Sequence, residues 1–144
     1  ETIINAISSS NSLIEIDVIS SNLESLPENN NVTFHKPTFQ IEKFYRQSDV
    51  VINGGGLTKY ECCYNLIPSA SFSLSQLQNE DSIILEKKNL ISNLGTDVNN
   101  KELISKKIDG LINDLILRKS IIENSIKTFG ANSNTNIFNK IIWI

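Results

Sequence analysis

The sequence has few of the residues that cross-link proteins or bind metals. Among its 144 residues are two cysteines, one histidine and no methionine. The cysteines are neighbours, Cys62 and Cys63, and adjacent cysteines rarely bond to each other, so we expect a reducing, cytoplasmic compartment. A lone histidine makes no zinc site, and we expect neither a metal nor a cofactor. Because the first residue is Glu1 rather than methionine, we interpret the start as internal to a longer gene product or as trimmed.

Excess positive charge and long apolar runs are also lacking. The formal net charge is −3 and the sequence pI is about 5.1, which argues against a protein that coats nucleic acid or an anionic membrane. No apolar run approaches the roughly 20 residues of a membrane-spanning helix. Residues 1–11 have neither the cationic start nor the apolar stretch of a signal peptide. With 40% hydrophobic residues, we expect one globular domain over residues 1–144.

Short apolar segments alternate with helical patterns along the chain. Apolar, β-branched runs predict strands, and apolar residues at helical spacing predict helices. The predicted strands are residues 13–20, 32–35, 49–53, 69–74 and 90–94. The predicted helices are residues 1–10, 41–47, 57–65 and 77–88, one that begins near residue 100, and then 120–129 and 136–144. This alternation predicts an α/β fold, a Rossmann-like parallel sheet with helices on both faces.

One segment, residues 49–61, combines a buried strand, a glycine turn and the start of a helix. Three consecutive glycines at 54–56 let the backbone turn tightly and approach a ligand closely. The helix that follows directs unpaired N–H groups to the same place, which favours an anion such as a diphosphate. Thr58 can add a hydroxyl, and Glu61 can accept hydrogen bonds from a ribose. The alternative is a turn without a ligand, in which Glu61 only caps the helix.

The run SDVVINGGGLTKYECCYNLIPSASFSLSQLQ, residues 48–78, resembles the nucleotide-sugar motif in the C-terminal half of GT-B proteins. Among these, it is most similar to the UDP-sugar hydrolases of pseudaminic acid biosynthesis and the related spore-coat polysaccharide proteins. The resemblance covers residues 31–95. It implies the C-terminal half of a GT-B fold, a UDP-sugar ligand, and a role in surface polysaccharide or nonulosonic acid biosynthesis.

The resemblance implies roles for individual residues. Gly55 and Gly56 match the glycines at the phosphates, and Glu61 matches the glutamate that holds the ribose hydroxyls. Gln78 matches a glutamine near the donor sugar, and residues 32–39 match the strand and loop beside the uracil edge. The predicted substrate-binding set is Gly55, Gly56, Leu57, Thr58, Glu61, Gln78, Phe34 and His35.

Two departures from the family pattern shape the functional prediction. Leu77 stands where the family usually has an asparagine near the sugar. The family's N-terminal half, which holds the catalytic histidine of the hydrolases, has no match here, so no catalytic residue is assigned. We therefore expect the donor-binding half of a UDP-deoxyaminosugar hydrolase. The alternatives are the donor-binding half of a GT-B glycosyltransferase and a noncatalytic nucleotide-sugar-binding subunit.

Other conspicuous side chains have more ordinary interpretations. His35 is either a satisfied structural residue or a neighbour of the uracil pocket. Lys59 is either a point charge for a phosphate or a solvated helix lysine. Cys62 and Cys63 are expected to pack in the core, and the apolar residues at 137–144 to belong to a core or an interface.

A doubly wound sheet places its first strand between the strands predicted at residues 13–20 and 49–53, and no segment here supplies it. Two buried strand edges would then be unpaired, at about 1–3 kcal/mol for each unpaired group. We expect one of three outcomes. A different strand order closes the gap, a partner copy fills it in a homodimer, or an upstream segment with the missing N-terminal domain supplies the strand.

Overall fold

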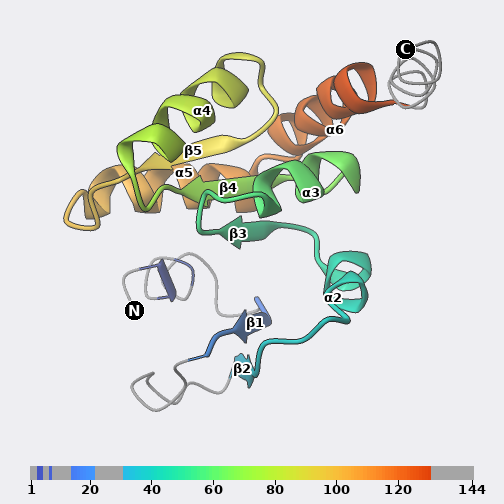
Figure 1. Cartoon of the computed structure of the whole chain (residues 1–144), viewed down its shortest axis with the longest axis vertical. Helices are drawn as coiled ribbons and strands as arrows, with labels where there is room; N and C mark the ends of the chain where they lie inside the picture. Colours follow the sequence, from blue (N-terminus) through green and yellow to red (C-terminus); the bar gives the residue numbers. More distant parts are fainter. Residues whose placement is uncertain (1–2, 5–6, 8–13, 22–30, 131–144) are drawn as a thin grey trace, which may run out of the picture.

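The computed structural model describes residues 3–4, 7, 14–21 and 31–130, in which strands alternate with helices (Figure 1). The strands are β1 (Ile16–Ile19), β2 (Val32–His35), β3 (Val51–Asn53), β4 (Ser69–Phe72) and β5 (Ser92–Gly95). The helices are α2 (Glu42–Gln47), α3 (Thr58–Tyr64), α4 (Gln76–Lys87), α5 (Lys101–Asn113) and α6 (Leu115–Phe129). The helix predicted at residues 136–144 lies outside the described residues, as do parts of the segments predicted at 1–10 and 13–20.

Every strand pair in the described residues is parallel, which confirms the predicted α/β fold class. β1 pairs with β2, so that Ile16 lies opposite Val32. β4 lies between β3 and β5, so that Ala70 has Ile52 on one side and Ser92 on the other. Parallel strands need long crossover connections, and here helices provide them between β3, β4 and β5.

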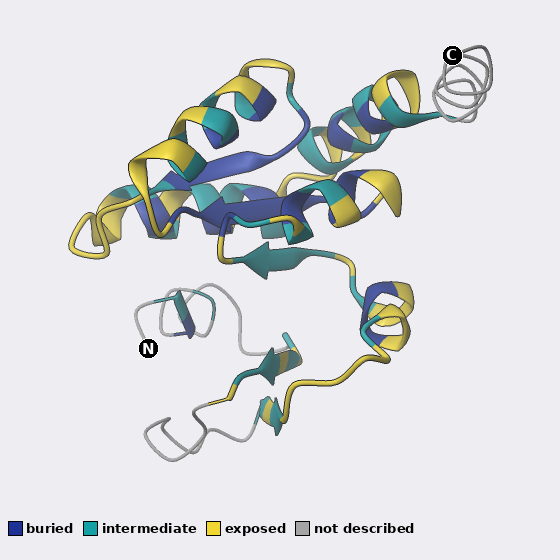
Figure 2. Cartoon of the chain, in the orientation of Figure 1, coloured by how far each residue is buried: buried dark blue, intermediate teal, exposed yellow. Residues whose placement is uncertain are grey.

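Helices cover both faces of the β3–β4–β5 sheet. On one face, Ala70 and Phe72 of β4 pack with Ile104 and Ile108 of α5 and with Ile121 of α6. Helices α3 and α4 contact β4 and β5 from the other face. All four residues of β4 are buried as a result, and Figure 2 shows this strand and β5 in the colour of buried residues.

Helix α6 begins at Leu115, earlier than the start at residue 120 that the sequence predicts. The side chain of Asp114 accepts hydrogen bonds from the backbone N–H groups of Ile116 and Leu117, and so caps the first turn. Asp114 is also the C-cap residue of α5, so the two helices are joined with no longer loop between them. The helical pattern expected from residue 100 onward is therefore divided at Asp114.

The strands form two separate sheets, because among the described residues neither β1 nor β2 pairs with β3, β4 or β5. The order is β1–β2 in one sheet and β3–β4–β5 in the other, with α2 on the connection between them (Figure 1). No rearranged strand order closes the gap among the described residues, so the first of the three expected outcomes is wrong. The partner copy and the upstream segment remain predictions.

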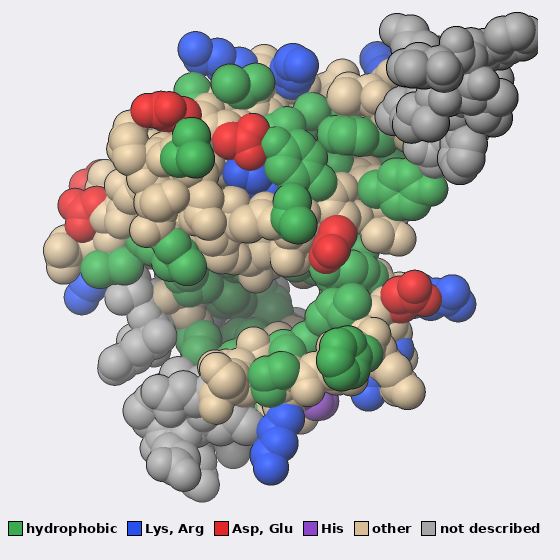
Figure 3. All heavy atoms as spheres, viewed as in Figure 1, with side chains coloured by type: hydrophobic (Ala, Val, Ile, Leu, Met, Phe, Trp, Pro, Cys, Tyr) green, Lys and Arg blue, Asp and Glu red, His purple; other side chains and the backbone are tan. Residues whose placement is uncertain are grey.

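The surface of the described part agrees with the composition. On the face drawn in Figure 3, Lys and Arg side chains are scattered and do not join into one continuous patch. A membrane-spanning helix would need a long apolar stretch, and none of the helices in the described residues has one.

Candidate functional site

The glycine turn between β3 and α3 is pressed against the end of β4. Gly55 has a φ of +74°, a conformation that side chains disfavour. A Cβ on Gly55 would lie 2.9 Å from the Cα of Ser73, the residue that follows β4. The N–H of Gly55 donates to the Asn53 side-chain oxygen at 3.1 Å, which tightens the turn. The fold itself thus requires glycine at position 55.

Gly56 differs from Gly55, although the sequence treats the two alike. A Cβ on Gly56 would meet no heavy atom within 4 Å. Its backbone is not in the left-handed region, so a side chain there causes no conformational strain. At Gly55 the protein itself excludes a Cβ, in addition to the close approach to a ligand that the sequence predicts. At Gly56 a ligand could occupy the open space.

The N-terminus of α3 offers weaker anion binding than the sequence predicts. Its N-cap residue is Leu57, which makes no side-chain cap hydrogen bond and is exposed. Thr58 is the first helical residue and is half-buried. The helix has only seven residues, so the field of its aligned peptide dipoles is weak. An anion at this place would have to be held by the turn and by side chains.

Glu61 is exposed, and its carboxylate is held from one side. The hydroxyl of Tyr45, a buried residue on α2, donates to Glu61 Oε2 at 2.9 Å. Burial and then this hydrogen bond raise the pKa of Tyr45. The bond orients the carboxylate through Oε2, and Oε1 is the oxygen that can accept from a ligand hydroxyl. This contact with another helix differs from the simple helix cap that was the alternative interpretation.

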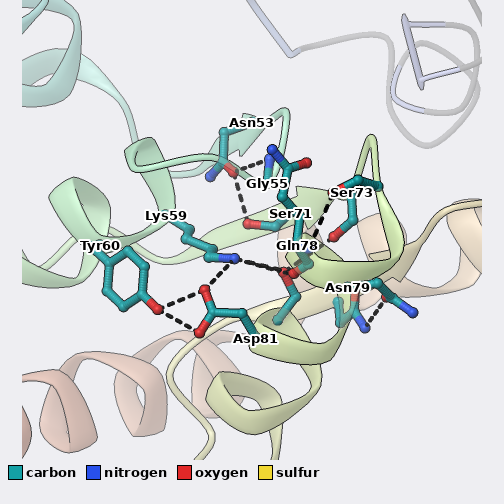
Figure 4. Close-up of polar contacts among 12 residues, drawn as sticks. Asn53, Gly55, Lys59, Tyr60, Ser71, Ser73, Gln78, Asn79 and Asp81 are labelled. Carbon is teal, nitrogen blue, oxygen red and sulfur yellow. Dashed lines mark hydrogen bonds and ion pairs between the residues drawn. The ribbon is translucent and has the colours of Figure 1, made fainter.

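Gln78 lies in the first turn of α4, close behind the glycine turn. Its Oε1 accepts from the N–H of Leu74 at 2.9 Å, and its own N–H donates to Ser75 Oγ at 3.3 Å. With Oε1 bonded in this way, Nε2 is the atom that can donate to a ligand. Leu77, which stands in place of the family asparagine, is exposed. Figure 4 shows Gln78, Ser73 and Gly55 in one group.

Phe34 and His35 lie on β2, in the other sheet. His35 Nε2 is 2.6 Å from Asp17 Oδ1 on β1, and its ring meets the ring of Phe44 edge-on at 4.8 Å. These contacts favour the structural interpretation of His35. Phe34 is half-buried opposite Val18. In the described part of the chain, neither residue makes a hydrogen bond or ring contact with the glycine turn.

Helix α2 is the link between these two parts of the predicted site. Phe44 on this helix contacts His35, and its neighbour Tyr45 binds Glu61. The structure thus places Gln78 beside the glycine turn through its bond to Leu74, and Glu61 on α3, the helix that follows the turn. Among the described residues, His35 is connected to Glu61 through Phe44 and Tyr45 of α2.

Lys59 matches neither of its two sequence-based interpretations. The residue is 1% exposed, and its Nζ lies 2.8 Å from Asp81 Oδ2 on α4. The hydrogen bond from Lys59, followed by that from Tyr60, lowers the pKa of Asp81. A lysine buried in this way neither faces solvent nor extends freely toward a ligand.

Both cysteines are buried, as expected. Burial is the main cause that raises the pKa of Cys62 to about 12, and it also raises the pKa of Cys63. Neither thiol is a nucleophile at neutral pH, because the thiolate is the reactive form. Among the described residues, no group of three metal-binding side chains comes together.

Three residues near the turn escaped the sequence analysis. Asn53 binds both the Gly55 N–H and the Ser71 hydroxyl, and an asparagine directly before glycines is a known turn signal that could have identified it. Ser73 supports the turn, and its place one residue after a buried strand is a weak signal. Tyr45 comes from another helix, so no local pattern could have revealed its bond to Glu61.

The fold resembles that of solved GT-B glycosyltransferases. A spinosyn forosaminyltransferase, SpnP, aligns with a TM-score of 0.62 at 14% identity, over 88% of this chain and 32% of its own. A glycotransferase of kitacinnamycin aligns with a TM-score of 0.68 at 12% identity, over 97% of this chain and 38% of its own. The chain therefore spans about a third of the length of these proteins. No family profile and no curated protein matches the sequence.

At such low identity the likeness concerns the fold. It places this chain in the class of α/β proteins with a Rossmann-like parallel sheet and a GT-B-like arrangement. Six of the eight site residues that the sequence nominates follow β3 or β4, at the edge where ligands bind in open α/β sheets, whereas Phe34 and His35 lie on β2.

Proposed function

We propose that this chain binds a nucleotide sugar and forms the donor-binding part of a longer, glycosyltransferase-like enzyme. The diphosphate would lie against the open side of Gly56, and Glu61 would hold the ribose hydroxyls. The nucleotide is a uridine diphosphate, as the resemblance of residues 48–78 implies. Gln78 Nε2 would donate to the sugar.

The exposed carboxylate of Glu61, oriented by Tyr45, carries this proposal. A surface glutamate without a partner samples many rotamers, whereas the Oε2 of Glu61 accepts from the Tyr45 hydroxyl at 2.9 Å. Preorganised acceptors suit a ligand with paired hydroxyls such as a ribose. The open space at Gly56, on the same strand-to-helix connection, gives room for the neighbouring phosphates.

Transfer to an acceptor is the reaction that we propose for the complete protein. Both solved proteins reported above are named as sugar transferases. Hydrolytic release of UDP from a deoxyamino sugar is the second candidate, because residues 48–78 resemble the hydrolase motif. In either reaction this part would stabilise the departing diphosphate, and the remaining protein would act on the acceptor or on water.

Isothermal titration of the 144-residue chain with UDP tests the proposal, with CMP and NADH as competing candidates. We expect UDP to bind and Glu61→Gln to weaken it by roughly tenfold or more, as for a lost hydrogen bond to a charged group. Glu102→Gln is the matched control, because Glu102 is an exposed glutamate in the first turn of α5, on the other face of the sheet. Absence of UDP binding in the folded chain would refute the proposal, and equal effects of the two variants would remove Glu61 from it.

A further inference from the structure

The ammonium group of Lys59 makes its ion pair and its two other hydrogen bonds with one helix. Its Nζ lies 2.8 Å from Asp81 Oδ2, 3.1 Å from Ser82 Oγ and 3.3 Å from the carbonyl oxygen of Gln78 (Figure 4). All three partners belong to α4, whereas Lys59 belongs to α3. A buried ammonium group is costly unless it is paired and hydrogen-bonded, so these contacts hold the two helices in one relative position.

The same network reaches the glycine turn. Ser82 Oγ donates to the carbonyl of Gln78 at 2.9 Å and lies 3.2 Å from Ser73 Oγ. Ser73 in turn lies directly against Gly55, where a Cβ would come within 2.9 Å of the Ser73 Cα. A continuous line of contacts therefore runs from Lys59 through two serines to the turn.

Gln78 is held in this network both by its backbone carbonyl and by its side-chain oxygen. Its backbone carbonyl accepts from Lys59 and Ser82, and its side-chain oxygen accepts from the N–H of Leu74. The rotation of the first turn of α4 decides where Gln78 Nε2 points. The bonds to its carbonyl set that rotation relative to α3.

We infer that Lys59 is a positioning residue for the nucleotide-sugar site, which rests on the proposed function. It does not bind phosphate. It fixes the first turn of α4 against the glycine turn, so that Gly56 and Gln78 face the same ligand. Removal of its ammonium group lets α4 shift, and the diphosphate and sugar contacts lose their common geometry.

The test compares two lysines that both tie a neighbouring element to α4. Lys59→Met removes the bond beside the turn. Lys107→Met is the control, because Lys107 Nζ binds Glu86 Oε1 at 2.7 Å in the later part of α4 and the carbonyl of Asn93 at 2.6 Å. Affinities for UDP and for uridine are measured by titration at a temperature where both variants are folded.

We expect Lys59→Met to lower the affinity for UDP by about tenfold, which is within the range of coupling in one hydrogen-bond network. The affinity for uridine should stay within about twofold of the wild-type value. Lys107→Met should leave the UDP-to-uridine ratio unchanged. A role in stability alone would lower both affinities together or neither. An unchanged ratio in folded Lys59→Met, where the wild-type chain binds UDP, would overturn the inference.

A second measurement needs no ligand and separates this inference from the proposed function. In ¹H–¹⁵N spectra, the amide signals of Gly55 and Gly56 should move in Lys59→Met and stay in place in Lys107→Met. Unmoved signals would overturn the positioning role even if UDP binds. If Lys59→Met does not fold, Asp81→Asn removes the charged partner, keeps the two neutral contacts of Lys59 and should move the same signals in the same way.

Discussion

The two sheets of this protein differ in how completely they are covered. Every residue of β4 is buried, because the strand has a neighbour on each side and helices on both faces. β1 and β2 each contain an exposed residue and no buried one, although Ile16, Val18 and Ile19 are as apolar as anything in β4. An apolar strand is buried only when both its faces and both its edges have partners. The β1–β2 sheet lacks them among the described residues.

Because of this difference, the residues predicted to bind the phosphates and sugar are packed more tightly than those predicted to lie beside the base. Gly55 and Gln78 lie beside the well-covered sheet, in the turn after β3 and in α4, where close contacts leave little freedom. Phe34 and His35 belong to the β1–β2 sheet. Helix α2 joins them through Phe44 and Tyr45. In the proposed site, the residues assigned to the phosphates therefore stand on firmly packed elements, whereas those assigned to the base depend on how the β1–β2 sheet is held.

Hydrogen exchange should show the largest contrast. Backbone amides of β4 are protected by global stability, and those of β1 and β2 open locally. We expect exchange in β1 and β2 to be faster by about three orders of magnitude or more. Equal protection in the two sheets would contradict the comparison, and would indicate that something covers the β1–β2 pair in solution.

Matched truncations should show the next largest contrast. Ile108 is 1% exposed in the main core, so Ile108→Ala should cost about 2–5 kcal/mol through lost burial and the cavity that remains. Val18 on β1 is half-buried, and Val18→Ala should cost less than about 1 kcal/mol. Urea denaturation of both variants measures the two costs. Similar values would mean that β1 contributes to the same core.

A smaller, pH-dependent effect on the free energy of unfolding should come from the contacts between α3 and α4. The pKa of Asp81 is lowered in the folded chain by its bonds to Lys59 and Tyr60. Its stabilising contribution is complete above the ordinary aspartate pKa of about 3.9, and disappears as the pH falls through the lowered value. Asp81→Asn should therefore reduce the free energy of unfolding at pH 7 and have no effect in strong acid. Urea titrations at both pH values measure this, and a loss that persists in acid would rule out a charge effect.

The sequence predicts the local elements well because their causes are local. Residues 32–35 form β2 as predicted, and the strand, turn and helix around residues 54–56 lie where glycine and apolar spacing place them. Helix α6 begins before the predicted residue 120 because Asp114 caps it, and an aspartate before an apolar run is a signal that the sequence carries.

Long-range contacts set the limit of sequence-based prediction. The burial of Lys59 depends on Asp81 and Ser82, which approach it only after α3 and α4 pack on the same sheet. The same holds for the bond between Tyr45 and Glu61. The different roles of Gly55 and Gly56 follow from where Ser73 lies, which no spacing of glycines reveals.

The most direct test of the central claim is the affinity of Gly56→Val for UDP and for uridine. A Cβ at Gly56 meets nothing within 4 Å, and the same is true of Gly110 in α5, so Gly110→Val is the control for the added side chain. We predict that Gly56→Val folds and loses UDP affinity by about tenfold or more, as steric overpacking gives, while it keeps uridine affinity and Gly110→Val keeps both. Wild-type UDP affinity in Gly56→Val would contradict the claim that the glycine turn holds the diphosphate.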